Sequence, residues 1–382
     1  MTRRILVAGD VLRPQDDAFR SSQNGNTLWL TRLIARPLAA ATGLAVTPLL
    51  WSPGERLPAE ARGFDTQALY AAAELDPAIE GWVRLFDAPD LPREAAALLA
   101  APFADAAFVV GFELPPLIKR LLTALGRPWV DLNIHPYRFG PDLLFAAEAG
   151  DAEVLAALAP HHTPDSWFAP HADILAATAV KLPPALPVTE SLLLIGQTRI
   201  DRSLIAEGRL LDLRDFAAPL RAALGSAPAI FKPHPYNAEG FGLHDLGLPF
   251  ARFREVAENI YILLAQDSLK RVVGVSSSVL AEARFWGKEA VALGTPPMRI
   301  APFRTSLAPG WHASVRDAWI NADFWRDLLA PFWPVSARDG ERVALPPDTL
   351  RRSLRQYWGF DELTHQLPWE LAATRAAARG VR

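Results

Sequence analysis

The fold is decided by the stretch Ser191-Leu192-Leu193-Leu194-Ile195-Gly196-Gln197-Thr198. A short apolar run that ends at glycine and polar residues is typical of a buried strand followed by a loop. The sequence predicts further strands at 229–231, 260–262, 271–275 and 289–293, and a helix at 278–286. Strands that alternate with helices indicate a parallel sheet with helices on both faces.

The N-terminal half repeats this alternation. Strands are expected at 4–8, 44–50, 106–110 and 129–132, and helices at about 27–41 and 115–125. A stiff, proline-rich segment at 180–188 suits a connection between domains. We therefore predict an α/β, GT-B-like fold, in which two Rossmann-like domains (1–182 and 183–382) flank a cleft. The tryptophan-rich region after residue 311 is expected to cap the core or to pack back on the first domain.

Composition excludes several classes of protein. The 382 residues carry a net charge of −3, which argues against nonspecific nucleic-acid binding. There is no cysteine, so disulfides, thiolate zinc sites and cysteine nucleophiles are excluded. The N-terminal apolar run is too short for a signal peptide, and no apolar stretch is long enough to span a membrane. A cytoplasmic location is expected.

Lys232-Pro233-His234-Pro235 follows the strand expected at 229–231. The prolines favour an extended turn, which would display a cation and a titratable imidazole at the edge of the sheet. Such a pair suits a phosphate or a leaving nucleotide. The alternative is a structural histidine in a proline-rich turn.

Ser276, Ser277 and Ser278 follow the strand at 271–275, and Glu282 lies one helical turn further on. Hydroxyls and backbone N–H groups at a helix N-terminus can bind an anion, and Glu282 could accept hydrogen bonds from ribose. The alternative is that Ser277 or Ser278 is only an N-cap. The Lys-Pro-His-Pro turn after another strand strengthens the prediction of an anion site.

The segment Gly196-Gln197-Thr198-Arg199-Ile200-Asp201-Arg202 again follows a strand. A carboxylate between two arginines is expected to stay ionised. Asp201 could therefore act as a nucleophile or a base, or it could form only a surface ion pair.

Polar side chains also follow strands of the N-terminal half, where the facing domain would close on the donor site. Glu113 could be the general base for an acceptor hydroxyl. The candidates for binding the acceptor or the sugar are Asn24, Asn26, His135, Arg138 and Arg202. Helix capping by the polar loop at 21–26 and a structural role for His135 are the alternatives.

Some motifs are absent. Without Asp-x-Asp, a metal held by that motif on a nucleotide diphosphate is not indicated, and no cofactor is expected. The lack of Gly-x-Gly-x-x-Gly, of a Walker loop and of Gly-x-Ser-x-Gly argues against a dinucleotide enzyme, a P-loop ATPase and a serine hydrolase of the elbow type.

The three second-half motifs together resemble those of bacterial Kdo transferases of capsule and O-antigen assembly, where Kdo is 3-deoxy-D-manno-oct-2-ulosonic acid. The resemblance is strongest to the retaining β-Kdo transferase domain that caps certain O-antigen polysaccharides, and it covers roughly residues 5–300. His-Pro and Ser-Ser elements also occur in bacterial CMP-sialic acid sialyltransferases. Members of the Kdo family are often modules of longer chains, whereas this sequence has one module, so the acceptor and any partner protein stay open.

The resemblance implies a GT-B-like fold, CMP-β-Kdo as the donor and no metal requirement. It implies that Lys232 and His234 hold the CMP phosphate with the help of the three serines, that Glu282 contacts ribose, and that Asp201 is the nucleophile. Asp201 would attack C2 of Kdo and release CMP, and an acceptor hydroxyl would then displace Asp201 with net retention. Gln197 and Arg199 would also lie at the donor site, where Arg199 or Arg202 would pair with the sugar carboxylate or position Asp201.

The expected partners are a CMP-sugar donor, bound by the C-terminal domain, and a glycan acceptor, bound by the N-terminal domain. A lipid-linked acceptor would bring the protein to the inner face of the inner membrane, peripherally or within an assembly complex. Two alternatives remain: a transferase of another CMP-nonulosonate, sialyltransferase-like or inverting, and a non-catalytic carbohydrate-binding protein. The intact His234, Asp201 and serine cluster argue against the second.

Overall fold

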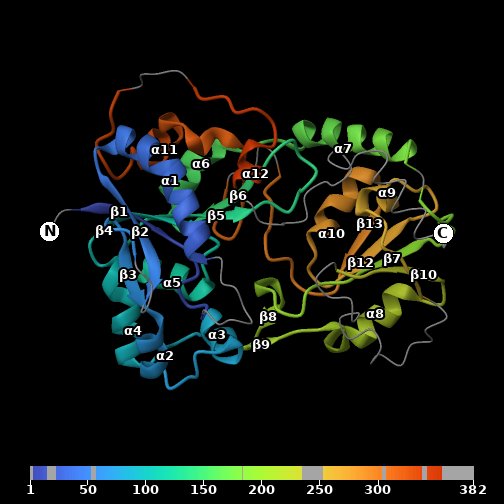
Figure 1. The fold of residues 1–382 in the computed structure, drawn as a ribbon, viewed down its shortest axis with the longest axis horizontal. Coiled ribbons are helices and arrows are strands. Elements are labelled where there is room, and N and C mark those ends of the chain that lie inside the picture. Colours follow the sequence, from blue (N-terminus) through green and yellow to red (C-terminus); the bar gives the residue numbers. More distant parts are fainter. Residues whose placement is uncertain are drawn as a thin grey trace.

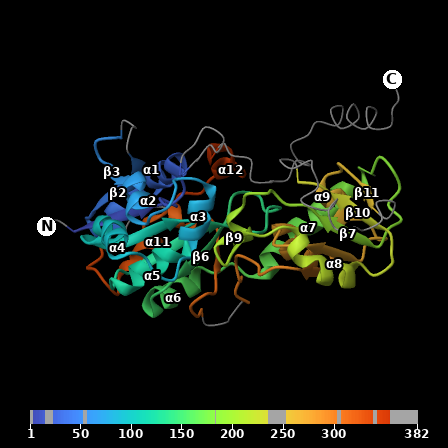
Figure 2. The ribbon, with the colours of Figure 1, turned by 90° about the horizontal axis from the view of Figure 1, so that it is seen from below.

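The computed structural model describes residues 3–14, 23–52, 57–182, 184–234, 253–302, 307–337 and 342–354. They form two α/β domains that lie next to each other along the long axis of the molecule (Figures 1 and 2). Each domain is built on a mainly parallel sheet, and a cavity lies between the two. The predicted fold class, two Rossmann-like domains with a cleft between them, is confirmed.

The sheet of the first domain has seven strands in the order β14-β6-β5-β4-β1-β2-β3. They are β1 (Arg4–Ala8), β2 (Ala45–Ser52), β3 (Arg62–Asp65), β4 (Ala106–Phe112), β5 (Trp129–Ile134), β6 (Phe145–Ala149) and β14 (Ala313–Val315). β6 and β14 run antiparallel to their neighbours, which departs from the parallel sheet that was predicted. β2 and β4 flank β1, so the chain reverses its order there and opens a crevice between the carboxyl ends of β1 and β4.

Helices cover both faces of this sheet. One face carries α1 (Gln23–Thr42), α6 (Ala152–Leu158), α11 (Ala322–Leu329) and α12 (Thr349–Leu354), and the other carries α2 (Thr66–Ala72), α3 (Ile79–Phe86), α4 (Arg93–Ala100) and α5 (Pro116–Ala124). In β1, Ile5 and Val7 pack into one core, and Leu6 and Ala8 pack into the other. A continuous apolar run is what a strand buried on both faces requires.

The sheet of the second domain is parallel and has the order β11-β10-β7-β12-β13. Its strands are β7 (Leu192–Ile195), β10 (Ala229–Lys232), β11 (Phe253–Glu255), β12 (Arg271–Gly274) and β13 (Glu289–Ala292). α7 (Asp165–Val180), α9 (Ile260–Leu264) and α10 (Ser278–Glu282) cover one face, α8 (Ala217–Leu224) covers the other, and a small ribbon comprises β8 (Ile205–Ala206) and β9 (Arg209–Leu210). A second crevice therefore opens between the carboxyl ends of β7 and β12.

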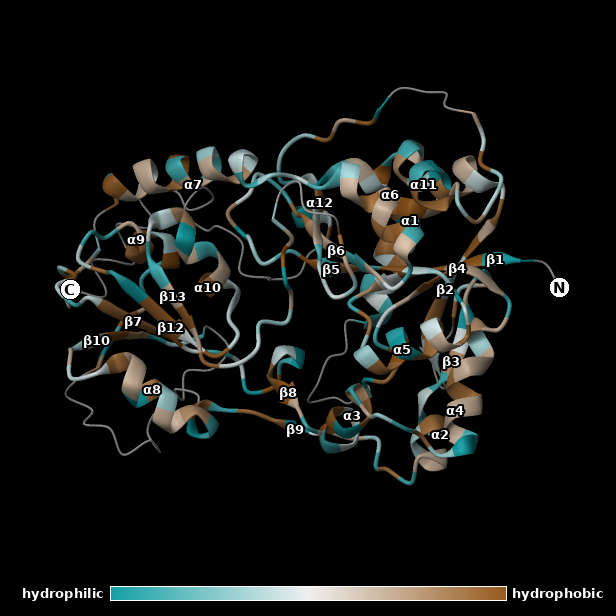
Figure 3. Cartoon of the chain, turned by 180° about the vertical axis from the view of Figure 1, so that it is seen from behind, coloured by the Kyte–Doolittle hydropathy of each residue, from teal (hydrophilic) through white to brown (hydrophobic). Residues whose placement is uncertain are grey.

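Hydropathy follows this layering. The central strand β7 consists of four buried aliphatic residues and is coloured as hydrophobic in Figure 3. Among the residues that the structure describes, no helix combines the length and the apolar character needed to cross a membrane.

The chain passes between the domains more than once. α7 precedes the predicted boundary at 182/183, yet its Phe168 and Leu175 pack into the core of the second domain. After β13 the chain returns to the first domain, where β14 pairs with β6 and α11 packs against α1 (Figure 1). Trp319 and Trp325, from the tryptophan-rich region, are fully buried in the core of the first domain.

Two local predictions are wrong. Residues 260–262 belong to helix α9, not to a strand, and the side chain of Asn259 caps this helix by accepting a hydrogen bond from the N–H of Tyr261. A short apolar run fits a strand and a buried helix equally well, which explains the error. The polar loop predicted at 21–26 is also helical where it is described, because α1 begins at Gln23; Ser21 and Ser22 lie outside the described residues.

Candidate active site

A cavity of about 1270 Å³ lies between the two domains. Its walls include residues at the carboxyl ends of strands in both sheets, which is where ligands of open α/β sheets bind. Small-ligand pockets typically measure about 300–1,000 Å³, so this cavity can hold a large ligand or two ligands together. Its polar lining includes Asp10, Arg13, Gln23, Glu113 and Arg138 from the first domain, and Gln197, Asp201, Arg202, Ser203, Lys232, His234, Ser276, Ser277, Ser278 and Glu282 from the second.

Three of these side chains bridge the crevice of the second sheet. Gln197 follows β7, and its amide nitrogen lies 2.9 Å from Ser276 Oγ and 2.8 Å from Ser203 Oγ. Gln197 Oε1 accepts a hydrogen bond from the N–H of Ser276, which follows β12. The predicted proximity of these two strand ends is therefore present in the structure, and the hydrogen bonds fix it.

Lys232 ends β10, on the other side of β7, and His234 lies in the turn that follows. The backbone N–H of Gly196 donates to the carbonyl of Lys232 at 2.8 Å. A Cβ added at Gly196 would lie 3.0 Å from the backbone nitrogen of His234 and 3.1 Å from Cα of Pro233, so the two loops meet closely because residue 196 is glycine. Burial lowers the pKa of His234, which nearby Asp201 partly offsets and Lys232 reinforces. His234 is therefore a neutral imidazole at pH 7.

Ser277 and Ser278 lie at the start of α10. Ser277 Oγ accepts a hydrogen bond from the N–H of Val279 at 3.4 Å, so Ser277 is the N-cap that the sequence left as an alternative. Both serines also line the cavity.

Asp201 stands at the start of a short turn, Arg202–Leu204. One of its carboxylate oxygens accepts a hydrogen bond from the N–H of Ser203 at 2.8 Å. Because Ser203 Oγ also contacts Gln197 and Ser276, the loop that carries Asp201 is fixed to the crevice of the second sheet.

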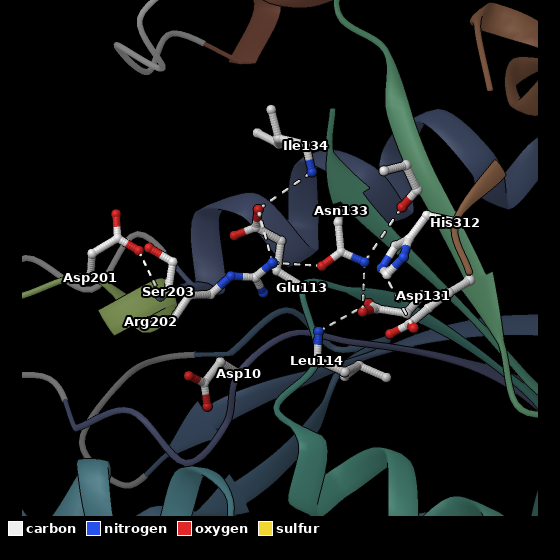
Figure 4. Close-up of polar contacts among 12 residues, drawn as sticks. Asp10, Glu113, Leu114, Asp131, Asn133, Ile134, Asp201, Arg202, Ser203 and His312 are labelled. Carbon is white, nitrogen blue, oxygen red and sulfur yellow. Dashed lines mark hydrogen bonds and ion pairs between the residues drawn. The ribbon is translucent and has the colours of Figure 1, made fainter. Parts of the chain in front are cut away.

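Arg202 connects this loop to the first domain (Figure 4). Its guanidinium donates to Asn133 Oδ1 at 2.6 Å and lies 3.6 Å from a carboxylate oxygen of Glu113. Although burial disfavours its charge, the surrounding carboxylates, those of Glu113, Asp131, Asp201 and Asp10, raise the pKa of Arg202. The residue next to Asp201 is thus held by groups of both domains.

Glu113 lies directly after β4, at the crevice of the first sheet. Its φ of 57° places it in the left-handed region, which is uncommon for a residue with a side chain and occurs often at functional sites. Its Oε1 accepts a weak hydrogen bond from the N–H of Ile134 at 3.4 Å, in addition to the contact with Arg202. In this conformation Glu113 contributes to the contact between the domains.

A buried network supports Asn133 from behind. Asn133 Nδ2 donates to Asp131 at 3.0 Å, and Asp131 pairs with Lys119 Nζ at 2.7 Å. Lys119 also pairs with Glu148, which lies 3.5 Å from His312. Burial opposes the charge of Lys119, but Asp131 and Glu148 raise its pKa. The network fixes the orientation of Asn133 and, through it, of Arg202.

Glu282 and Arg138 meet where the domains contact each other. A carboxylate oxygen of Glu282 accepts hydrogen bonds from the backbone N–H of Arg138 and from the hydroxyl of Tyr261. Glu282 is 1% exposed, and burial raises its pKa to about 7, although the contacts with Arg138 and Tyr261 lower it. A carboxyl that can carry a proton at neutral pH is able to donate as well as accept a hydrogen bond.

Four predicted residues lie elsewhere. Arg199 is exposed and does not line the cavity. Asn24 and Asn26 do not line it either: the side chain of Asn24 bonds to the backbone of Trp51, and Asn26 is buried. His135 is buried in the core: Nδ1 accepts from the N–H of Tyr137, so Nε2 donates to Ser314 Oγ at 2.8 Å. Burial holds the pKa of His135 well below its usual range. This geometry gives His135 a structural role.

Asp10, Arg13 and Gln23 line the first-domain side of the cavity but were not among the site residues predicted from the sequence, although Gln23 belongs to the polar loop predicted at 21–26. Asp10 follows β1 after Gly9 and lies at the crevice between β1 and β4. A carboxylate right after the first strand of an α/β domain was the available signal, but only the strand order shows that this strand end is the point where the chain reverses.

In the described segments, no group of three or more histidine, aspartate or glutamate side chains is arranged to hold a metal ion. Metal independence stays a prediction.

No protein-family model matches the chain, and no curated protein sequence matches it significantly. Among solved structures, it is similar to the β-Kdo 2,7 transferase of Thermosulfurimonas dismutans KpsC (TM-score 0.33, 13% identity, covering 62% of this chain and 80% of that one). It is similar to the β-Kdo 2,4 transferase of the same protein (TM-score 0.34, 16% identity, covering 59% of this chain and 79% of that one). It is also similar to Arabidopsis thaliana UGT89C1 complexed with UDP (TM-score 0.30, 12% identity, covering 98% of this chain and 94% of that one). Similarities this low assign neither a family nor an activity.

Proposed function

We propose that the chain is a glycosyltransferase that transfers Kdo from CMP-β-Kdo to a glycan hydroxyl with retention of configuration. The observation that carries the proposal is the composition of one cavity wall. Lys232, His234 and the serine cluster, which suit a phosphate, line the same cavity as Asp201, a carboxylate on a fixed loop. The motif resemblance supplies the identity of the sugar.

In this proposal, the second domain holds the donor. Lys232 provides the positive charge for the single phosphate of CMP, and neutral His234 donates a hydrogen bond to it. Ser276 lies within the hydrogen-bonded cluster with Gln197 and helps to place the serine loop. These groups stabilise the charge that develops on the leaving phosphate without a metal ion.

The sugar is then transferred in two steps. A carboxylate oxygen of Asp201 attacks C2 of Kdo, the bond from C2 to the phosphate oxygen breaks, and CMP leaves with the electron pair. An acceptor hydroxyl next attacks C2 from the face that CMP left, and Asp201 recovers its electron pair as a carboxylate. Two inversions give net retention. A ketosidic centre passes through an oxocarbenium-like transition state, which a nearby carboxylate stabilises.

The test is CMP release from CMP-Kdo, compared with UDP release from UDP-sugars, for the wild type, Lys232→Ala and Arg32→Ala. Arg32 forms an exposed ion pair with Glu60 and serves as the control. We expect CMP release by the wild type and by Arg32→Ala, loss of at least roughly ten-fold in Lys232→Ala, and no UDP release. Release from UDP-sugars alone would refute the proposed donor. Release from neither donor class, by folded protein, would refute the activity.

A further inference from the structure

We propose that Asp10 is the general base that takes the proton from the acceptor hydroxyl when it displaces the sugar from Asp201. This inference rests on the proposed function and goes beyond it, because that mechanism leaves the proton of the acceptor unassigned. The sequence pointed to Glu113 for this role, and the geometry of the two carboxylates distinguishes them.

The position of Asp10 suits the role. It lies at the carboxyl end of β1, at the crevice of the first sheet, and lines the same cavity as the second-domain residues that would hold the donor. Asp10 and Asp201 both raise the pKa of Arg202, so both carboxylates lie near this side chain (Figure 4). A base on the facing domain can reach a hydroxyl that enters between the domains.

The carboxylate of Asp10 is rigidly held. Trp82 Nε1 donates to Oδ2 at 2.9 Å, and the N–H of Leu12 donates to Oδ1 at 3.1 Å. Two hydrogen bonds hold the loop after β1 against α2. The hydroxyl of Tyr70 donates to the carbonyl of Leu12 at 2.8 Å, and the hydroxyl of Thr66 donates to the carbonyl of Val11 at 2.8 Å. A fixed carboxylate keeps its orientation during catalysis, and each oxygen retains a lone pair for a substrate proton.

The electrostatic surroundings agree with this geometry. Burial raises the pKa of Asp10 to about 6, against the lowering effects of Trp82, Arg13 and Arg202. Tyr70 faces Asp10 from α2, and burial raises its own pKa far above neutrality, so it stays uncharged. A base is most effective when its pKa lies near the working pH. Glu113 instead pairs directly with the guanidinium of Arg202 at 3.6 Å, which ties this carboxylate to the contact between the domains.

The acceptor O–H bond breaks and its proton moves to Asp10, while the acceptor oxygen forms a bond to C2 of the sugar. The bond between C2 and Asp201 breaks, and its electron pair returns to Asp201. Asp10 then loses the proton to solvent. No oxidant, reductant or metal is needed.

The experiment follows the breakdown of the sugar–Asp201 adduct by intact mass spectrometry after a pulse of CMP-Kdo. Water and azide serve as the two probes, because azide is already ionised and needs no base. In Asp10→Asn, we expect the adduct to form, its breakdown by water to slow by roughly 10²–10⁴-fold, and azide to restore breakdown to the wild-type rate. CMP binding by the variant checks that it is folded. In Trp82→Phe, loss of the hydrogen bond should move the acid limb of the breakdown profile to higher pH.

The outcomes separate the two proposals. If neither the wild type nor Asp10→Asn forms the adduct, the covalent mechanism fails and this inference fails with it. If the wild type forms the adduct and Asp10→Asn breaks it down in water at the wild-type rate, only this inference is overturned. It is also overturned if Glu113→Gln, and not Asp10→Asn, shows the slow step that azide restores, or if Trp82→Phe leaves the acid limb unchanged.

Discussion

Replacement of Arg202 by alanine tests whether the contact between the domains positions Asp201. The change removes a hydrogen bond from a charged donor to Asn133 and the ion pair with Glu113. The side chain is 21% exposed, so solvent screens the contact only partly. Hydrogen bonds to charged groups contribute about 1.5–3 kcal/mol, and about 1.4 kcal/mol corresponds to a factor of ten. We therefore expect adduct formation in a single turnover to slow by roughly 10–100-fold.

The affinity for CMP should change little in Arg202→Ala, because Lys232 and His234 lie on β10 and its following turn, apart from the Arg202 contact. Asn133→Ala removes the same hydrogen bond from the other side, so the double variant should be little worse than Arg202→Ala. Arg202→Lys, which retains the charge but not the planar fork, should recover part of the rate. Arg202 does not position Asp201 if Arg202→Ala forms the adduct as fast as Arg32→Ala, or if the effects of Arg202→Ala and Asn133→Ala simply add.

Three further predictions concern other parts of the molecule. Burial raises the pKa of Glu282 in the folded chain from 4.5 to about 7, so the wild type loses stability as pH rises from about 4.5 to about 7. Glu282→Gln should remove this loss, which reaches roughly 3 kcal/mol at pH 8. The prediction is contradicted if urea unfolding gives the same difference in free energy of unfolding between Glu282→Gln and the wild type at pH 4 and at pH 8. Gly196→Ala should weaken CMP binding in calorimetry, because the added Cβ would meet the backbone of the Lys-Pro-His turn. In the control Gly25→Ala, the added Cβ has nothing within 4 Å, so CMP binding should stay unchanged and α1 should gain about 0.5–1 kcal/mol of stability. Equal affinities of Gly196→Ala and Gly25→Ala for CMP would contradict the close approach of the two loops. His135→Phe should lower the free energy of unfolding by about 1–3 kcal/mol, because it leaves Ser314 Oγ and the N–H of Tyr137 without this partner. The affinity for CMP should stay the same. A loss of CMP affinity at unchanged stability would show that His135 acts at the site.

The central strands could be predicted because each is a short apolar run. Parallel strands bring their carboxyl ends to one edge, so the polar residues after β7, β10 and β12 were expected to meet, and Gln197 and Ser276 do. The apolar run at 260–262 misled the prediction, although Asn259 was available as a capping signal for α9.

The rest depends on tertiary structure. Local sequence does not predict the order of strands in a sheet. The crevice at which Asp10 lies could therefore not be predicted, because it depends on the pairing of β4 with β1. The packing of α7 on the second sheet and the return of β14 to the first likewise depend on contacts between distant segments. Arg199 and Arg202 both lie within two residues of Asp201 in the sequence. Only the structure shows that Arg202 is the one that bonds to Asn133 of the facing domain.

The proposed function requires that this cavity binds a CMP-sugar and that Asp201 forms a bond to the sugar. Intact mass spectrometry after incubation with CMP-Kdo tests it most directly. We expect a mass gain of one Kdo that peptide mapping assigns to Asp201 and that is absent in Asp201→Ala. Turnover of CMP-Kdo with no adduct in the wild type and none in the trapping variant Asp10→Asn, or an adduct that persists in Asp201→Ala, would contradict it.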